Sequence, residues 1–192
     1  MILAAAVVLG LAVALVRYGR RGFTRIAAMP LRWAWLALLA LALQVPILRA
    51  PAGPADGFFL QRTLLLTSYL LLLLFVLINR RQAALLIVGL GVLCNLAVIL
   101  ANQEYMPITP QTLVAINPGS AVQQWQVGTH YGYSKDIILT RGETHLWPLS
   151  DLLVIPPPFP WPTAFSIGDL FLAAGIVVLL AAPGFIIERR VS

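Results

Sequence analysis

Apolar residues dominate five runs of this chain, and polar residues gather between them. The runs cover roughly residues 1–16, 26–48, 63–78, 83–101 and 164–187. Each is long enough, or nearly so, to cross about 30 Å of hydrocarbon as an α-helix. The first and third runs are short, and the arginines that flank them can extend to the membrane surface. We therefore predict an all-α membrane protein with five transmembrane helices in a single polytopic domain, residues 1–192.

Small residues and one amide mark the faces on which these helices pack. Ala6, Gly10 and Ala14 recur at intervals of four in the first run, a stripe suited to close helix packing. In the fourth run Gly91 and Asn95 share one helical face. The glycine allows close backbone approach, and an amide inside the bilayer needs a partner, so we expect both to face a neighbouring helix.

Positive charge alternates along the chain in a way that orients the predicted helices. Nine of the thirteen lysine and arginine residues fall at residues 17–32, 80–81 and 189–190. Cytoplasmic loops carry an excess of such residues, which predicts an external N-terminus and a cytoplasmic C-terminus. The first run precedes its arginines, the reverse of a secretory signal peptide, so we expect it to be retained. The partner of this charge is the lipid bilayer and not nucleic acid.

The longest polar stretch, residues 103–163, is predicted to be an external segment with its own structure. Aromatic and β-branched residues are frequent in it, which is atypical of a disordered loop. Residues 129–133 and 136–140 alternate around a turn signal at residues 134–135, which predicts a short β-hairpin. The prolines of residues 156–162 predict a stiff, extended approach to the last helix. The fold class is thus five transmembrane helices with a small extracytoplasmic domain.

The residues that commonly bind metals and cofactors form no recognisable pattern. Cys94 is the single cysteine, and it lies inside the fourth run. His130 and His145 stand fifteen positions apart in the external segment, without the spacing of a zinc site. No glycine-rich nucleotide-binding motif is found. We expect no metal and no cofactor.

Two aspartates, Asp151 and Asp169, are the candidate catalytic residues. Asp169 stands at the start of the last apolar run, and Asp151 lies eighteen positions earlier in an apolar setting. Ionisable groups at the edge of the hydrocarbon are costly and call for an explanation. Two carboxyl groups held close together share a proton and can act as general acid and base. Polar residues predicted near the outer ends of the helices could support such a pair: Gln44, Ser68, Asn102 and Ser166.

A purely structural role explains Asp169 equally well. Ser166 followed three positions later by Asp169 is a helix N-capping pattern, in which the hydroxyl and the carboxylate satisfy free N–H groups. A negative charge in the first turn of a helix is also favoured by the helix dipole. The sequence therefore leaves open whether Asp151 and Asp169 meet.

The motifs around both aspartates resemble those of signal peptidase II, the lipoprotein-processing aspartyl protease. The residues concerned are Leu149-Ser150-Asp151-Leu152 and Phe165-Ser166-Ile167-Gly168-Asp169. The resemblance covers about twenty residues and implies catalytic roles for Asp151 and Asp169 alone. It makes an aspartyl hydrolase acting at the outer leaflet one interpretation of the chain.

The chain as a whole resembles an uncharacterised family of bacterial multi-pass membrane proteins, a domain of unknown function. The segments that carry this resemblance are Arg17-Tyr18-Gly19-Arg20, Pro30-Leu31-Arg32-Trp33, Tyr105-Met106-Pro107 and Ser166-Ile167-Gly168-Asp169. It implies location in the bacterial cytoplasmic membrane and no known reaction. The leading interpretation is an accessory or structural subunit of a membrane complex, with other membrane subunits as partners. A hydrolase and a small ion-coupled carrier are the alternatives.

Overall fold

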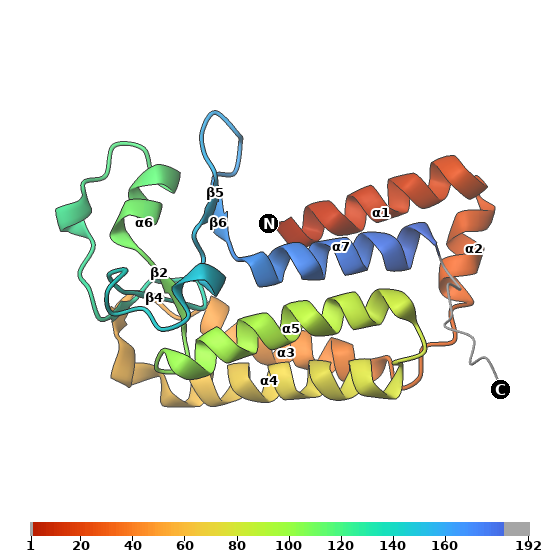
Figure 1. The fold of residues 1–192 in the computed structure, drawn as a ribbon, viewed down its shortest axis with the longest axis horizontal. Coiled ribbons are helices and arrows are strands. Elements are labelled where there is room, and N and C mark those ends of the chain that lie inside the picture. The colour runs from red at the N-terminus through yellow and green to blue at the C-terminus, as the bar shows by residue number, and fades with distance from the viewer. Residues whose placement is uncertain (1, 183–192) are drawn as a thin grey trace.

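A computed structural model describes residues 2–182, and Figure 1 shows its helices and strands. The helices are α1 (Ile2–Tyr18), α2 (Arg21–Ala27), α3 (Trp35–Leu48), α4 (Phe59–Ile78), α5 (Ala83–Ala101), α6 (Pro110–Ile116) and α7 (Ile167–Ala181). The strands are β1 (Gly53–Pro54), β2 (Met106–Ile108), β3 (Thr129–His130), β4 (Asp136–Ile138), β5 (Leu153–Ile155) and β6 (Thr163–Phe165). Three short 3-10 helices complete the structure: η1 (Ala55–Phe58), η2 (Val122–Gln124) and η3 (Trp147–Leu149).

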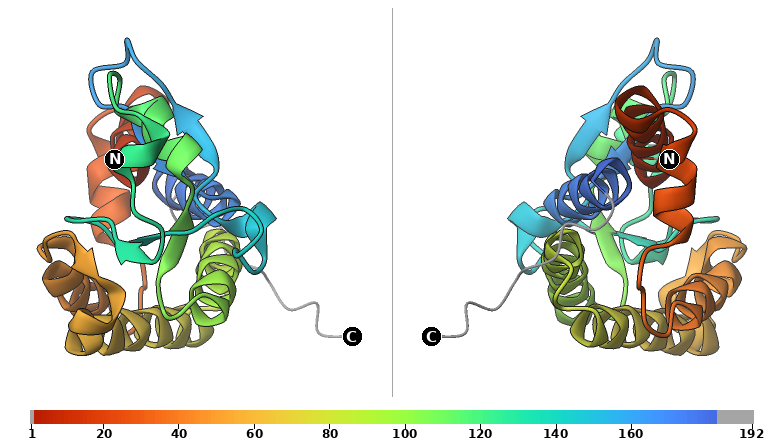
Figure 2. Two further views of the ribbon diagram at one scale, coloured as in Figure 1. Left: turned by 90° about the vertical axis from the view of Figure 1, so that its left-hand side faces the viewer. Right: turned by 90° about the vertical axis from the view of Figure 1, so that its right-hand side faces the viewer.

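The five long helices run side by side, and the strands gather at one end of them (Figure 1). Seen along the long axis, α1, α7, α5, α4 and α3 follow one another around an arc (Figure 2). The packing agrees with this order, because α1 contacts α7, α7 contacts α5, α5 contacts α4, and α4 contacts α3. The connecting loops at the opposite end hold the short helix α2.

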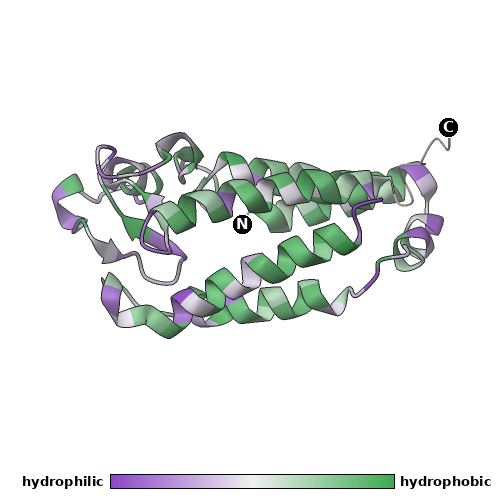
Figure 3. Cartoon of the chain, turned by 60° about the horizontal axis from the view of Figure 1, so that its bottom comes forward, coloured by the Kyte–Doolittle hydropathy of each residue, from purple (hydrophilic) through white to green (hydrophobic). Residues whose placement is uncertain are grey.

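Two of these helices are long and apolar enough to cross a membrane. They are Ala55–Ile78, which joins η1 to α4, and Ala83–Ala101, which is α5. The helices α1, α3 and α7 are apolar but shorter over the described residues. Figure 3 shows apolar residues along the helices and polar residues at both ends of the molecule.

The second predicted span, residues 26–48, is wrong in its first part. The helix ends at Ala27 and resumes only at Trp35, so α3 has 14 residues. Pro30 lies in the break, and the residue before a proline avoids the helical conformation, which explains why the helix stops here. Trp33 adopts a positive φ of 54° in the same loop.

The other predicted spans agree with helices in number and order, with shifts at their ends. The run at residues 63–78 starts earlier, at Phe59, and the run at residues 83–101 matches α5 at both ends. The last run begins with strand β6 before α7 starts at Ile167, and residues 183–187 of that run lie outside the described part of the chain.

The predicted hairpin in segment 103–163 is confirmed and belongs to a larger sheet. Strand β3 pairs antiparallel with β4, with His130 opposite Ile137. The four-stranded sheet has the order β1-β3-β4-β2, in which β2 and β4 run parallel. Strand β1 comes from the loop between α3 and α4, for which no strand was predicted. A second hairpin, β5 with β6, encloses the prolines that were predicted to form a stiff extended approach.

One hydrophobic core joins the sheet to the helices. Ile47 of α3, Leu65 of α4 and Val98 of α5 pack in the same buried cluster as Met106 and Ile137 of the sheet. Segment 103–163 is therefore folded against the ends of the helices and is not a separate appendage.

The predicted small-residue contacts are confirmed in detail. Ala6, Gly10 and Ala14 are the buried residues of α1, and a Cβ at Gly10 would lie 2.9 Å from the Cβ of Leu180 on α7. On α5, a Cβ at Gly91 would lie 2.5 Å from the carbonyl oxygen of Gly168. Small residues thus allow α7 to approach both α1 and α5 closely.

Candidate functional site

The only lysine of the chain lies between the two candidate aspartates. Lys135 Nζ is 3.8 Å from Asp151 Oδ2 and 3.7 Å from Asp169 Oδ2. The lysine side chain is 21% exposed and the Asp151 side chain only 4% exposed. The structure therefore brings Asp151 and Asp169 to one site, with an ammonium group bridging them.

Three different parts of the fold deliver these groups. Lys135 stands in the turn between β3 and β4, and its carbonyl accepts a hydrogen bond from Met106 N, 2.9 Å away, at the start of β2. Asp151 follows η3, and its backbone N–H donates to the carbonyl of Pro107 at 3.1 Å. Asp169 lies in the first turn of α7. The site is thus the junction between the sheet and the helix bundle.

Asp169 also forms the N-capping arrangement that the sequence predicts. Its Oδ2 accepts from the backbone N–H of Ser166 at 3.3 Å, and its own N–H donates to Ser166 Oγ at 3.0 Å. Its Oδ1 accepts a third hydrogen bond from Asn95 Nδ2 on α5, at 2.7 Å. Asn95 Oδ1 in turn accepts from the Ser166 hydroxyl at 2.8 Å. The Asn95 amide therefore ties α5 to the start of α7, as expected of an amide within the bundle.

A third carboxylate, Asp136, completes the cluster. The side chains of Asp136 and Asp151 lie within hydrogen-bonding reach of each other. Asp136 Oδ1 and Asp151 Oδ1 are both buried and have no hydrogen-bond donor among the described residues. Three of the four aspartates of the chain thus converge on its single lysine.

Burial and charge shift the titration of this cluster in a consistent way. Burial raises the pKa of Asp151 well above its usual range; the Lys135 ammonium opposes this, and the neighbouring carboxylates reinforce it. Burial likewise raises the pKa of Asp136. For Lys135, burial alone would lower the pKa, but Asp151 and Asp169 outweigh it and hold the pKa well above its usual range. The cluster therefore favours the charged form of the lysine.

The other polar residues predicted to support the pair are placed differently. Ser166 belongs to the site, as described above. Gln44 Nε2 donates to Ser68 Oγ at 3.0 Å, and the Ser68 hydroxyl donates to the carbonyl of Leu65, which joins α3 to α4. Asn102 bonds the backbone of His145 through both its oxygen and its nitrogen, each at 2.9 Å. These contacts hold neighbouring elements together and do not reach either aspartate.

Sequence reasoning did not assign Lys135 or Asp136 to the site. Lys135 lies in the predicted turn and Asp136 is the first residue of the predicted strand, and charged residues at a hairpin turn are normally solvated. Two features of the sequence could have pointed to Lys135. It is the single lysine of a chain with twelve arginines, and an acidic residue and an apolar strand follow it.

The histidines take up structural positions. His130 is fully buried, with Nδ1 3.0 Å from the carbonyl oxygen of Pro51 and Nε2 2.9 Å from that of Ser134. Its ring packs against Phe58 and Tyr105. Among residues 2–182, no group of three or more histidine, cysteine or acidic side chains is arranged to hold a metal ion.

Comparison with known proteins identifies the family but no activity. Residues 28–181 match the model of a family of unknown function, DUF5317. The chain belongs to this family. The matched region starts after α2, so it contains α3 to α7 and the whole lysine–aspartate cluster, and it leaves out α1. It is this family, and not signal peptidase II, that the chain matches. No curated protein and no solved structure is similar enough to match.

Proposed function

We propose that this DUF5317 protein is a non-enzymatic membrane protein, an accessory or structural subunit of a membrane complex. Segment 103–163 would be its external docking domain. The observation that carries the proposal is the position of Lys135, which pairs with Asp151 of that segment and with Asp169 of α7. The cluster would fasten the domain to the helices.

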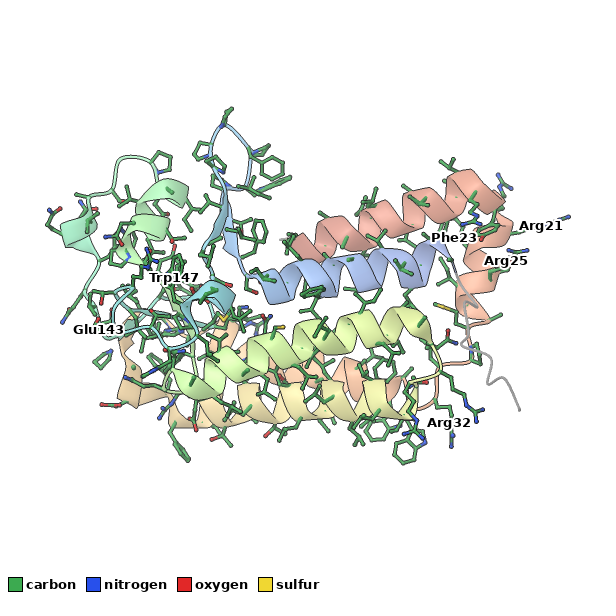
Figure 4. All side chains as sticks on the ribbon, in the orientation of Figure 1. Arg21, Phe23, Arg25, Arg32, Glu143 and Trp147 are labelled. Carbon is green, nitrogen blue, oxygen red and sulfur yellow. The ribbon has the colours of Figure 1, made fainter. Side chains whose placement is uncertain are left out.

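The proposed membrane placement uses all five long helices. Helices α1, α3 and α7 lie beside the two helices that are long enough to span, and their exposed surfaces are apolar (Figure 3). Arg21, Arg25 and Arg32 lie at one end of the molecule, and Glu143 and Trp147 at the other (Figure 4). The positive-inside rule favours a cytoplasmic position for the arginine end, in the bacterial cytoplasmic membrane, with the N-terminus outside.

Several features favour a structural role over catalysis. Both oxygens of Asp169 accept hydrogen bonds from Ser166 and Asn95. An ammonium stands between Asp151 and Asp169, whereas an aspartyl protease dyad shares a proton directly between its two carboxyl groups. Two cavities in the described part of the chain, of about 600 and 460 Å³, are lined by other residues.

One observation supports a second candidate, an aspartyl hydrolase. The unpartnered Oδ1 atoms of Asp136 and Asp151 would both be satisfied by one shared proton, and such a pair can act as acid and base. A carrier that moves protons would use the same pair, since ionisable groups near the membrane often mark proton pathways. Cleavage of a lipid-anchored peptide by the purified protein, abolished in Asp151→Asn, would favour the hydrolase.

Replacement of Lys135 tests the structural proposal directly. Lys135→Met leaves three buried carboxyl groups without their cation, and removing one partner of a buried ion pair costs about 3–5 kcal/mol. We expect the external segment to detach from the helices. Limited proteolysis of the protein in nanodiscs should then cut within residues 110–160 much faster than in the wild type.

Lys135→Arg is the matched control, because it keeps a cation at the same position. It should retain most of the protection against proteolysis. Equal protection in the wild type and in Lys135→Met would show that the cluster does not hold the domain and would reject the proposed anchoring role.

A further inference from the structure

One cavity of the structure lies at the opposite end from the lysine–aspartate cluster. It measures about 460 Å³ and lies where the loop before α3 meets the turn between α4 and α5. Arg32, Arg80 and Arg81 line it, and no acidic residue does. Three guanidinium groups around one cavity favour an anionic ligand, since arginine binds phosphate oxygens through several N–H donors.

The charge of this cavity is not neutralised within the described structure. None of the three arginines forms an ion pair with a residue between 2 and 182. Arg80 and Arg81 are exposed in the turn, and Arg32 is exposed in its loop. By contrast, Arg62 at the other end pairs with Glu104 at 3.5 Å. An anion entering the cavity would therefore meet guanidinium groups that no acidic residue between 2 and 182 neutralises.

The backbone around the cavity is held in place by Asn79. Its Oδ1 accepts from Arg32 N at 2.7 Å, and its Nδ2 donates to Arg32 O at 2.8 Å and to Phe75 O at 2.9 Å. This buried amide fastens the Arg32 loop to the end of α4. The three arginines are thus brought together by the fold, although Arg32 stands far from the other two in sequence.

One further donor lines the same cavity, and helix α5 begins directly after it. Gln82 lines it and is 5% exposed, and its side-chain amide makes no hydrogen bond to another described residue. Gln82 is also the N-cap residue of α5, and no side chain caps this helix. The first N–H groups of a 19-residue helix carry partial positive charge and favour an anion.

Two aromatic side chains that follow Arg32 favour a position of the cavity at the level of lipid headgroups. Trp33 and Trp35 follow Arg32 and are 55% and 57% exposed, with ring centroids 6.5 Å apart. Tryptophan is enriched at the membrane–water interface, where its ring contacts both lipid and water. A phosphate held beside these rings would carry its acyl chains along the apolar surfaces of α3 and α4.

We propose that the cavity bounded by Arg32, Arg80, Arg81 and Gln82 binds the phosphate of an anionic phospholipid headgroup on the cytoplasmic side. The inference rests on the membrane placement proposed above. It goes beyond the role of arginines in setting the orientation of helices in the membrane. That role depends on the number of positive charges near the helix ends, whereas the lipid site depends on the cavity that these residues line.

Native mass spectrometry of the detergent-solubilised protein tests this site. The probes are phosphatidylglycerol, phosphatidylcholine and inorganic phosphate. We expect the wild type to retain phosphatidylglycerol in preference to phosphatidylcholine. Arg80→Gln/Arg81→Gln should reduce that preference by roughly tenfold or more, since the charge-assisted hydrogen bonds from two guanidinium groups to the phosphate are lost.

The control is Arg20→Gln/Arg21→Gln, which removes two exposed arginines from the same end of the molecule but outside the cavity. It should keep the wild-type preference. An equal loss of the preference for phosphatidylglycerol in both variants would mean that unspecific surface charge causes it, and this would overturn the proposal. Binding of inorganic phosphate that displaces phosphatidylglycerol completely at millimolar concentration would also overturn it, in favour of a soluble phosphate ligand.

Two further measurements keep the result decisive. If Arg80→Gln/Arg81→Gln does not fold, Arg32→Gln replaces it, with the same expected loss of preference. The membrane placement is tested separately by cysteine accessibility. Labelling that follows the proposed orientation, together with no preference for phosphatidylglycerol, rejects the lipid site alone.

Discussion

At the scale of single residues, the chain concentrates its buried charge at one point. Asp136, Asp151 and Asp169 surround Lys135, and two carboxylate oxygens, one each on Asp136 and Asp151, have no donor among the described residues. Breaking a buried ion pair is far more costly than losing an exposed one, because the remaining charge stays desolvated. A proton shared between Asp136 and Asp151 would lower this cost, because it would remove one negative charge.

Asp151→Asn and Asp151→Ala should therefore differ. Asn keeps a donor for Asp136 in place of the shared proton, so we expect near wild-type stability at pH 7. Ala leaves Asp136 with an unsatisfied buried oxygen, which costs about 1–3 kcal/mol. Thermal unfolding in detergent measures the difference, and equal melting temperatures for the two variants would contradict a hydrogen bond at this position.

The same pair predicts the direction of the pH dependence. Because the folded-state pKa of Asp151 is raised, the folded protein binds more protons than the unfolded chain above about pH 4. The contribution of Asp151 to stability is thus fully present at low pH and is lost as the pH rises through the folded-state pKa. Melting temperatures measured between pH 4 and 8 should depend less steeply on pH in Asp151→Asn than in the wild type. An unchanged pH dependence of the melting temperature would show that another group, and not Asp151, causes it.

At the scale of elements, close contact between α5 and α7 positions the site. Gly91 of α5 faces the Gly168 carbonyl, and Gly168 lies against Asn95, where an added Cβ would fall 2.0 Å from Asn95 Oδ1. Asn95 can reach Asp169 and Ser166 because the two helices approach so closely. The hydrogen bonds of Asn95 to Asp169 and Ser166 therefore depend on these two glycines.

Gly91→Ala should destabilise the protein despite the better helix propensity of alanine. The propensity gain is about 1 kcal/mol, but the new Cβ would meet backbone atoms of α7, and overpacking of this kind costs about 1–3 kcal/mol. We expect a lower melting temperature in detergent. Gly142→Ala is the control, since nothing lies within 4 Å of its Cβ position. A Gly91→Ala variant as stable as this control would mean that α7 shifts without cost.

At the scale of the whole molecule, the two ends of the helix bundle carry different polar features. The folded segment with the lysine–aspartate cluster lies at one end, and the arginine-lined cavity lies at the other (Figure 4). A membrane across the five helices would place these two features on opposite sides. This arrangement makes the orientation testable with one residue from each end.

Cysteine accessibility in intact cells tests that orientation. In a Cys94→Ser background, Gln123→Cys and Arg20→Cys introduce exposed thiols near the two ends. We expect a membrane-impermeant maleimide to label Gln123→Cys in intact cells and Arg20→Cys only after the membrane is opened. The reverse pattern would invert the topology, and labelling of both in intact cells would argue against a membrane between them.

The sequence by itself determined the elements of this protein. Apolar runs and small-residue stripes depend on local periodicity, so the helices, the face of α1 that contacts α7 and the β3–β4 hairpin could be predicted. The Ser166–Asp169 cap was also predictable, because its partners are three residues apart. The break at Pro30 is a local signal too, but the apolar run concealed it.

Only the tertiary structure decided which polar groups meet. Lys135 lies in a turn, Asp151 follows a loop and Asp169 opens a helix, and no periodicity relates these positions. The same holds for Arg32 and the Arg80–Arg81 turn, which are brought together by the amide of Asn79. Contacts of this kind depend on how distant elements dock, and docking is governed by the summed packing of the core rather than by the residues at the site.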